Sequence, residues 1–326
     1  MNILVTGGAG FIGSHLVERL LHDGHRVEVL DDFNDFYDPH RKEGNLAYVR
    51  NRITVHRADI VDAPAVQQIV TAGRFDALVH LAARAGVRPS IKHPALYVQT
   101  NVMGTLNLLD AARDAKVPRF IFGSSSSVYG LCRQIPFRED VALQETISPY
   151  AATKLAGEQL CSNYAHLYGL RVVCLRFFTV FGPRQRPDLA IHQFTERILA
   201  GRPIRQFGDG STRRDYTYVE DIVSGIVASL AYEGPIFDVF NLGGSETTSL
   251  GDLIRALEVQ LDLKATIEHL PEQPGDLPLT YADISKARER LGYSPRTPLR
   301  EGLAKFVAWY YDWLASGTHA PAEATR

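Results

Sequence analysis

The sequence predicts an α/β fold, with a doubly wound parallel sheet and a smaller C-terminal α/β lobe that binds substrate. Two observations support this. A short apolar run, Ile3–Thr6, leads through the glycine-rich Gly7–Gly13 into a segment with helical spacing, Ser14–Asp23. Beyond it, short apolar runs alternate with helical runs as far as Arg176. Strands alternating with helices are typical of a parallel sheet covered on both faces.

The elements follow in order from their spacing. Ile3–Thr6 is apolar enough for a fully buried strand, and Ser14–Asp23 carries Leu16, Leu20 and Leu21 at helical intervals. The further strands are expected at Val27–Leu30, Thr54–Arg57, Ala77–Leu81, Arg119–Gly123 and Val172–Arg176. The further helices are expected at Ala63–Ala72, Pro94–Ala115 and Tyr150–Tyr168. Ligands of such sheets bind beyond the carboxyl ends of the strands.

The composition changes from about Phe177 onward, where Pro, Gly and Arg gather at 182–187 and Gly and Asp at 208–210. The later elements are expected to be helices His192–Ala200, Asp221–Tyr232 and Leu299–Ser316, and a strand Val239–Leu242. We therefore expect one domain from residues 1–176 plus about 216–245. A second lobe is expected from about 177–215 plus 246–316, followed by a flexible tail at 317–326.

The bulk properties argue against several classes of protein. The chain has 326 residues, 45% of them hydrophobic, and a formal net charge of −2, so it has no electrostatic reason to bind nucleic acid or an anionic membrane. Cys132, Cys161 and Cys174 form no C-x-x-C pair and are expected to be free thiols. We find no signal-peptide pattern and no apolar run of about 20 residues. The sequence predicts a cytoplasmic protein.

The glycine-rich turn predicts a dinucleotide site. Gly8–Gly13 matches G-x-G-x-x-G directly after a strand and at the start of a helix, where a pyrophosphate meets backbone N–H groups and the positive helix end. Asp31, at the end of the next strand, can accept hydrogen bonds from the ribose hydroxyls of NAD and would repel the 2′-phosphate of NADP. We therefore expect a Rossmann domain that binds NAD. The contacts expected in this part of the site are Gly7, Gly10, Phe11, Ile12, Gly13 and Asp31.

Residues at the ends of the next strands extend this site. Asp59 and Ile60 are predicted adenine contacts, although Asp59 could instead cap the following helix. Leu81 and Ala82 are expected to lie beneath the dinucleotide. The preceding His80 is expected to be a packed core residue, and Asn101 a buried amide bonded to backbone.

A possible proton-transfer pair follows at Tyr150 and Lys154. Residues four apart on a helix share one face, and a nearby ammonium lowers the pKa of a phenol from about 10. Such a phenol can take a proton from a substrate hydroxyl near neutral pH. On its own the pair is a weak signal. The histidines form no H-x-x-x-H or H-E-x-x-H pattern and no G-x-S-x-G elbow is present, so neither a metal site nor a serine hydrolase is predicted.

These motifs together resemble the extended short-chain dehydrogenase/reductase family, and within it the nucleotide-sugar 4-epimerases. The resemblance runs over nearly the whole chain, from about Met1 to Ser316. Its motifs are Thr6–Gly13, Ser124–Gly130, Tyr150–Lys154 and Phe207–Gly210, with Arg214-Asp215-Tyr216 after them. It implies NAD as cofactor, with Lys154 bonded to its nicotinamide ribose, and Tyr150, Lys154 and Ser125 as the catalytic residues.

The finer resemblance is to UDP-glucuronate 4-epimerases, through Phe177–Asp188, Asn34–Pro39 and Ala85–Arg88. It implies a UDP-sugar substrate, with Arg214 on the diphosphate, where a fork of donors suits phosphate. The substrate-binding residues implied are Ser126, Ser127, Thr179, Arg88, Arg186, Arg214, Gln206 and Asp276. Many relatives carry Arg where this chain has Gln273, so diphosphate contacts on that side are less well supported.

The mechanism implied by the family is oxidation at carbon 4, rotation of the 4-keto sugar and reduction on its other face. For a uronic acid that ketone is a β-keto acid, which can lose carbon dioxide. We expect the hydroxyls of Ser126, Ser127 and Thr179 to hold the carboxylate against that loss. Related dehydratases carry Asp-Glu just after the active-site Ser/Thr, and decarboxylases carry Glu just before the Val. This chain has Ser126 and Ser127 at those positions.

Alternatives remain open at this point. A UDP-glucose or UDP-N-acetylglucosamine 4-epimerase is the nearest, followed by a UDP-glucuronate decarboxylase and by an NAD-binding protein without activity. The resemblance also implies a homodimer through a four-helix bundle of Pro94–Ala115 and Tyr150–Tyr168. Leu106, Leu109, Leu160 and Leu167 could face either that interface or the sheet.

Overall fold

The computed structural model describes residues 1–143, 145–271 and 277–316. Its centre is a seven-stranded sheet in the order β11-β6-β5-β4-β1-β2-β3, and neighbouring strands are parallel throughout. The strands are β1 (Asn2–Thr6), β2 (Arg26–Asp31), β3 (Thr54–Arg57), β4 (Ala77–His80), β5 (Arg119–Ser125), β6 (Arg171–Phe177) and β11 (Phe237–Leu242). The predicted doubly wound parallel sheet is confirmed.

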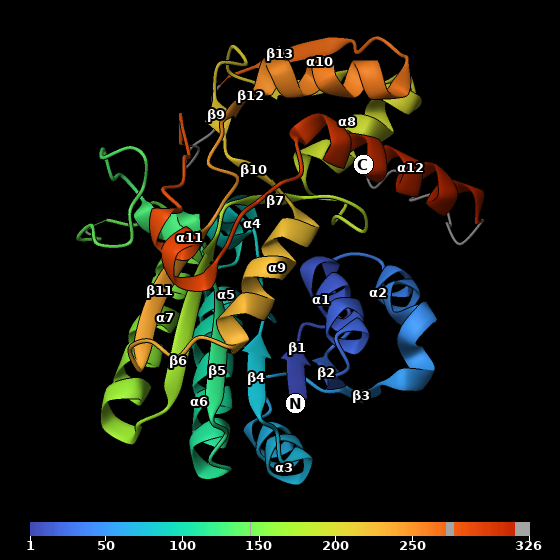
Figure 1. Cartoon of the computed structure of the whole chain (residues 1–326). Coiled ribbons are helices and arrows are strands. Elements are labelled where there is room, and N and C mark those ends of the chain that lie inside the picture. The colour runs from blue at the N-terminus through green and yellow to red at the C-terminus, as the bar shows by residue number, and fades with distance from the viewer. Residues whose placement is uncertain (144, 272–276, 317–326) are drawn as a thin grey trace.

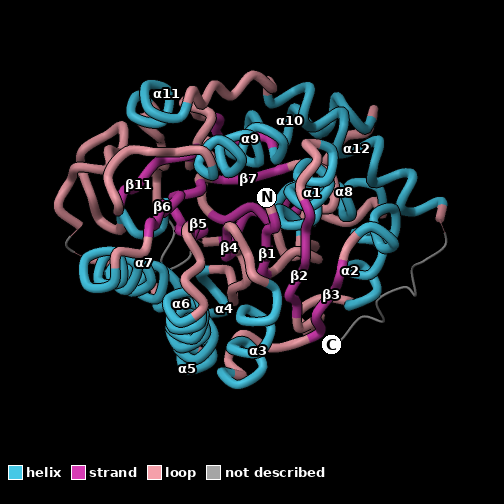
Figure 2. Tube along the Cα trace, turned by 60° about the horizontal axis from the view of Figure 1, so that its bottom comes forward, coloured by secondary structure: helices cyan, strands magenta, loops and turns pink. Residues whose placement is uncertain are grey.

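Helices cover both faces of this sheet (Figure 2). On one face α1 (Phe11–His22) and α9 (Val219–Leu230) pack against each other and against the sheet in one apolar core. On the other face α3 (Ala63–Gly73), α6 (Gly104–Asp114) and α7 (Pro149–Tyr168) enclose a second core. Burial of apolar side chains in these two cores is the main free-energy gain that holds the helices against the sheet.

The chain reverses its direction of winding at β1 and β4, which are neighbours in the sheet. Thr6, the last residue of β1, is in register with Leu30 on one side and His80 on the other. The chain therefore leaves these strands at one shared edge, where the crevice of a doubly wound sheet lies.

The second half of the chain builds a lobe beyond that edge (Figure 1). Helices α8 (Ala190–Leu199), α10 (Leu250–Leu261) and α12 (Leu299–Ala315) share a third apolar core. Beside them, β8 (Ile204–Phe207) pairs in parallel with β13 (Ile267–Leu270). The exact division of the chain between two domains stays a prediction, and the predicted tail at 317–326 lies outside the described residues.

The predicted helices differ from the structure by one or two residues at their ends, and two of them differ by more. The helix expected from Ser14 begins at Phe11, because Gly10 is its N-cap and the glycine turn runs straight into the first turn. The single helix expected at Pro94–Ala115 is a continuous helical run of three pieces: α5 (Pro94–Tyr97), a π-helical turn η2 (Val98–Met103) and α6. Such π turns often mark functional sites.

Several short elements were not predicted, because they lack a long periodic pattern. They are α2 (Pro39–Leu46), η1 (Ala47–Arg52), α4 (Val87–Lys92), η3 (Ser126–Tyr129), β7 (Thr179–Phe181), β9 (Arg213–Arg214), β10 (Tyr216–Tyr218), β12 (Thr248–Ser249) and α11 (Ser285–Leu291). Helix α10 and strands β8 and β13 were also missed. Within the described ranges, no helix is both long and apolar enough to cross a bilayer.

Candidate active site

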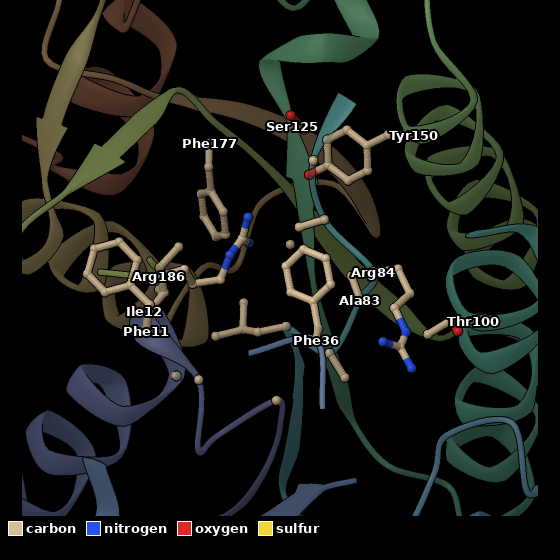
Figure 3. A pocket seen from close by; sticks show the side chains of 18 of the residues that line it. Phe11, Ile12, Phe36, Ala83, Arg84, Thr100, Ser125, Tyr150, Phe177 and Arg186 are labelled. Atoms are coloured by element: carbon tan, nitrogen blue, oxygen red, sulfur yellow. The ribbon is translucent and has the colours of Figure 1, made fainter. Parts of the chain in front are cut away.

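A pocket of about 470 Å³ opens at the carboxyl ends of the central strands (Figure 3). The predicted cofactor residues that line it are Gly7, Gly10, Phe11, Ile12, Gly13, Asp31, Asp59, Ile60, Leu81, Ala82 and Lys154. The other predicted residues that line it are Ser125, Tyr150, Ser126, Ser127, Thr179 and Arg186. The fold therefore brings the predicted cofactor site and the predicted catalytic residues into one cavity.

The glycine turn has the shape that a pyrophosphate needs. A Cβ atom on Gly13 would lie 2.2 Å from the Gly7 carbonyl oxygen, so the first turn of α1 can pack this closely only with glycine there. Gly10 and Phe11, at the start of α1, line the pocket. The N–H groups of that first turn and the positive helix end border the cavity.

Asp31 is fixed by backbone and by a lysine that the sequence analysis missed. Its carboxylate accepts hydrogen bonds from the Ala9 and Phe33 N–H groups at 3.1 and 2.9 Å. Burial raises the pKa of Asp31, and the positive charge of Lys42 opposes that rise. The Lys42 ammonium lies 3.5 Å from Asp31 and 3.7 Å from Asp32. The arrangement keeps an acceptor for ribose hydroxyls at this end of the pocket.

Asp59 lines the pocket, and its contact with adenine stays a prediction. Helix α3 is capped by Asp62, whose side chain accepts from the Ala65 N–H, so the capping alternative for Asp59 is wrong. His80 is a core residue as expected, with its ring nitrogens 2.7 and 2.9 Å from the hydroxyls of Thr6 and Thr105.

Arg84 is a pocket residue that the sequence analysis missed. Asn101 holds its backbone at both the N–H and the C=O, at 2.8 and 2.9 Å, which confirms the predicted role of that buried amide. Among the described residues, the buried Nε of Arg84 has no hydrogen-bond partner. Figure 3 shows its guanidinium beside Thr100 at the edge of the cavity. A cationic side chain in the lining of this cavity fits an anionic cofactor such as NAD. Arg84 follows Leu81 and Ala82, which were predicted cofactor contacts, and this position in the sequence could have identified it as a pocket residue.

The catalytic residues come from β5 and from the first two turns of α7. Helix α7 starts at an N-cap, Ser148, which accepts from the Ala151 N–H, so Tyr150 falls in its first turn. The Tyr150 phenol is hydrogen-bonded to the Ser125 hydroxyl, and Figure 3 shows the two side chains turned toward one another. The buried Lys154 ammonium donates to the Gly123 carbonyl oxygen at 2.7 Å.

The pKa of the Tyr150 phenol is raised, whereas the sequence predicted that it would be lowered. Burial raises the pKa of the Tyr150 phenol, while the Ser125 hydrogen bond and the positive charge of Arg186 oppose that rise. The cation that acts on the phenol here is therefore Arg186, whereas Lys154 is engaged with the β5 backbone. Burial also lowers the pKa of Lys154 to about 8.

The three consecutive serines Ser125–Ser127 give the pocket a polar lining beside the Tyr150 phenol. Ser125 is the N-cap of η3, where its Oγ accepts from the Ser127 N–H and donates to the Ser127 Oγ, both at 3.2 Å. Ser126 and Ser127 therefore turn back over the end of β5 and line the pocket. Thr179, which starts β7, lines the same cavity.

Arg186 supplies positive charge at this end of the pocket. Asp188 holds its guanidinium through two hydrogen bonds, at 2.9 and 2.7 Å, in the fork geometry typical of such pairs. The segment continues into α8, where His192 Nδ1 donates to the Gln185 carbonyl oxygen at 3.1 Å.

Three predicted substrate residues lie outside the lining of this pocket. Arg88 stacks on the Phe207 ring at 4.6 Å, next to the buried Gln206. Arg214 donates to the Arg213 carbonyl oxygen at 2.9 Å. Their roles stay predictions, and Gln273 and Asp276 lie outside the described residues.

Sequence comparisons group the chain with sugar-nucleotide enzymes. The family model described as GDP-mannose 4,6 dehydratase matches residues 4–306. UDP-glucuronate 4-epimerase 4 of Arabidopsis thaliana is 41% identical, over 99% of this chain and 78% of its own length. UDP-glucuronate 4-epimerase of Thermodesulfobacterium geofontis is 41% identical, over 94% of this chain and 95% of its own length.

Solved structures of sugar-nucleotide epimerases have the same fold as this chain. The UDP-glucuronic acid 4-epimerase from Bacillus cereus, in complex with UDP-glucuronic acid and NAD, is 40% identical with a TM-score of 0.91, covering 96% of this chain and 100% of the other. The UDP-glucose 4-epimerase from Thermotoga maritima with UDP-glucose is 34% identical with a TM-score of 0.90, again covering 96% and 100%.

Proposed function

The chain belongs to the extended short-chain dehydrogenases/reductases that the GDP-mannose 4,6 dehydratase family model describes, and we propose that it epimerises UDP-glucuronate to UDP-galacturonate at carbon 4 with NAD. Relatives named UDP-glucuronate 4-epimerase at about 40% identity over nearly the whole chain support this substrate. NAD is bound in the similar Bacillus cereus structures, and the glycine turn, Asp31 and Arg84 of this chain suit it.

One observation carries the choice of reaction: the composition of the pocket beside Tyr150. The carboxylates among the described lining residues are Asp31, Asp32 and Asp59, which lie at the predicted ribose and adenine end. Beside the phenol the lining is instead hydroxyls and Arg186. A 4,6-dehydration needs a second acid there to take the proton from carbon 5. The family model's name therefore does not describe the chemistry of this pocket.

The residues divide the chemistry as follows. Tyr150, as the phenolate, takes the proton from the 4-hydroxyl and later returns it, while Ser125 shares the hydrogen bond that places this oxygen. NAD held by the glycine turn, Asp31 and Lys154 would supply the acceptor and the later donor of the hydride of carbon 4. Arg186 supplies positive charge that favours the ionised phenol, and the Lys154 ammonium would bond the nicotinamide ribose of NAD. Substrate and product have the same oxidation level.

A uronate needs its carboxylate held away from the alignment that releases carbon dioxide. We expect Ser127→Ala combined with Thr179→Val to lower UDP-galacturonate formation by about tenfold, because each hydroxyl is a hydrogen-bond donor to a charged group. The same variant is expected to release a UDP-pentose, which NMR of the reaction mixture detects. Unchanged turnover with no pentose would contradict this role.

Turnover is expected to fall as the pH rises through about 8. Lys154 acts as a cation, and burial lowers its pKa to about 8, so its charge is present below that pH and is lost above it. Measuring kcat from pH 6 to 10 shows this fall, which forms the alkaline limb of the pH profile. In Lys154→Arg, which keeps its charge to beyond pH 12, the residual activity should show no fall near pH 8. The same fall in both proteins would assign the limb to another group.

A neutral hexose is the second candidate substrate, because the Thermotoga maritima neighbour is a UDP-glucose 4-epimerase. Arg186 favours the uronate, since a partly buried guanidinium gains more from a carboxylate than from a hydroxymethyl group. Comparing kcat/KM for UDP-glucuronate, UDP-glucose and UDP-N-acetylglucosamine tests this choice. A larger value for either neutral sugar would overturn the proposed substrate.

We also propose that the protein acts in the cytoplasm as a homodimer through the helical run 94–114 and α7. Along this surface Val98, Met103 and Leu167 are exposed, whereas Leu109 is buried against the sheet and Leu106 and Leu160 pack partly against it. Figure 2 places α5, α6 and α7 on one side of the molecule. Sedimentation should give twice the monomer mass, and Val98→Asp with Met103→Asp should give monomers. A monomeric wild-type protein would contradict the proposal.

A further inference from the structure

Three consecutive residues at the end of β5 are each held by a side chain of α7. These α7 residues follow one another at intervals of four, so they lie on one face of the helix, a turn apart. The contacts are Tyr150 with the Ser125 hydroxyl, Lys154 Nζ with the Gly123 carbonyl oxygen at 2.7 Å, and Glu158 Oε1 with the Ser124 hydroxyl at 2.5 Å. The first two contacts belong to the catalytic residues, and the third is unassigned. We call the three contacts together the α7–β5 ladder.

The third contact is anchored from a second strand. Arg176, near the end of β6, donates from Nε and Nη2 to the two oxygens of Glu158 at 2.9 and 2.7 Å. The side chains of Arg176 and Glu158 are only 4% and 3% exposed. Burying an ion pair costs desolvation that its attraction barely repays, so such a pair is weak evidence for a stabilising role. What it does provide is one fixed geometry for the oxygen that receives the Ser124 hydroxyl.

The helix lies unusually close to the strand at this level. A Cβ atom on Gly157 would come within 2.4 Å of the Phe122 ring, so this turn of α7 leaves no room for a side chain against β5. The Lys154 ammonium lies 5.1 Å from the centre of the same ring. Small shifts of α7 along β5 would therefore move Tyr150 relative to Ser125.

We propose that Glu158 is a positioning residue: clamped by Arg176, it holds the end of β5 through Ser124 and so sets the Ser125 hydroxyl against the Tyr150 phenol. This inference rests on the proposed function, because its readout is the rate of the same epimerisation. Glu158 does not itself line the pocket, but its carboxylate accepts from Ser124, which does, so Glu158 acts on the reacting atoms through Ser124 and Lys154.

Glu158 has a second effect, on the charge of Lys154. Burial lowers the pKa of Lys154, and the groups that oppose this fall are the Cys161 and Cys174 thiols and the Glu158 carboxylate. On the opposite side, the Lys154 charge lowers the pKa of His80, which burial holds neutral. Tyr150 precedes Lys154 by one turn of the same helix. Glu158 is thus the carboxylate that favours the cationic form of Lys154.

The test compares two ladder variants with a matched control in the full-length protein. Ser124→Ala removes the third contact and leaves the ion pair intact. Glu158→Gln keeps an acceptor for Ser124 but removes the negative charge. Cys161→Ala, also buried on α7, removes a core side chain that makes none of the three ladder contacts, and it is the control for kcat and Tm only, because Cys161 also acts on the pKa of Lys154. We measure kcat, KM for UDP-glucuronate, the pH profile, UDP affinity by calorimetry and Tm for all of them.

The expected results separate positioning from general loss of stability. Ser124→Ala should lower kcat by roughly 10- to 100-fold, as displaced catalytic groups do, with KM and UDP affinity changed by less than about twofold. Glu158→Gln should in addition move the alkaline limb to lower pH. Cys161→Ala should keep kcat within about twofold despite a lower Tm.

Two outcomes would overturn the inference. In the first, Ser124→Ala has the same kcat as Cys161→Ala. In the second, the loss of kcat in every variant is proportional to its fall in Tm. If Glu158→Gln does not fold, Ser124→Ala decides alone, since it leaves no buried charge without its partner. A wild-type protein that does not convert UDP-glucuronate refutes the proposed function, whereas an active wild type with unaffected ladder variants refutes this inference only.

Discussion

Tyr150→Phe should lower kcat for UDP-glucuronate by about 10²–10⁴-fold, the usual worth of a positioned proton-transfer group. The substitution removes one oxygen and keeps the ring, which packs edge-on against Tyr97 with ring centroids 6.3 Å apart. Because the sugar and the nucleotide are bound by other residues, KM should change by less than about twofold. Initial rates of UDP-galacturonate formation measure both constants.

The matched control is Tyr97→Phe, which also removes one buried hydroxyl from a neighbouring ring. That hydroxyl donates to the Ala85 carbonyl oxygen at 2.8 Å, so its loss should cost about 1 kcal/mol of stability and leave kcat within about threefold. Equal rate losses in the two variants would mean that the phenol at 150 contributes only packing.

Gly13→Ala should yield protein without bound NAD. A methyl group there would lie 2.2 Å from the Gly7 carbonyl oxygen and 2.8 Å from the Gly8 Cα, and both are backbone atoms that cannot rotate away. The turn must open, at a cost of ~1–3 kcal/mol, and the N–H groups that face the pyrophosphate move with it. Nucleotide released on denaturation, measured by chromatography, should fall to under about a tenth of the wild-type amount.

Gly44→Ala is the control for this substitution. Gly44 lies in α2 with no atom near the position of an added Cβ, so alanine should raise stability by about 0.5–1 kcal/mol and leave NAD content unchanged. Full NAD content in Gly13→Ala would show that the turn tolerates the methyl group and that the argument from close packing is wrong.

The local patterns predicted the cofactor half of the site because its residues are near one another in sequence. The turn 7–13 follows its strand directly, and Asp31 ends the next one, so strand and turn signals alone place them. Lys42 and Arg84 were missed because their positions depend on how α2 folds back over β2 and how the turn at Asn101 holds the chain after β4. No short-range pattern carries that information.

The catalytic half depended on the family resemblance. Tyr150 and Ser125 meet only because α7 packs on β5, 25 positions apart in the chain. The prediction that Lys154 lowers the pKa of Tyr150 was reasoned from helix spacing, yet the ammonium turns to the Gly123 carbonyl, and Arg186 from the other half of the chain supplies the charge. Side-chain direction in a buried site is decided by such tertiary partners.

The substrate half was predicted least completely. Ser126, Ser127, Thr179 and Arg186 line the pocket, whereas Arg88, Gln206 and Arg214 lie beyond its lining. Arg88 of α4 stacks on Phe207 of β8 in the lobe. If Arg88 binds the nucleotide, the substrate site extends to the surface between α4 and β8. The order of the sequence motifs does not define that surface.

The proposed reaction is tested most directly by a proton NMR time course of UDP-glucuronate with the protein in D₂O. The expected product is UDP-galacturonate, with protium retained at carbon 4, because that hydrogen leaves and returns as hydride. Protium is also expected at carbon 5, because no carboxylate lines the described pocket beside Tyr150, and no UDP-pentose should form. Deuterium at carbon 5, a UDP-pentose as the main product, or no conversion at all would contradict the proposed reaction.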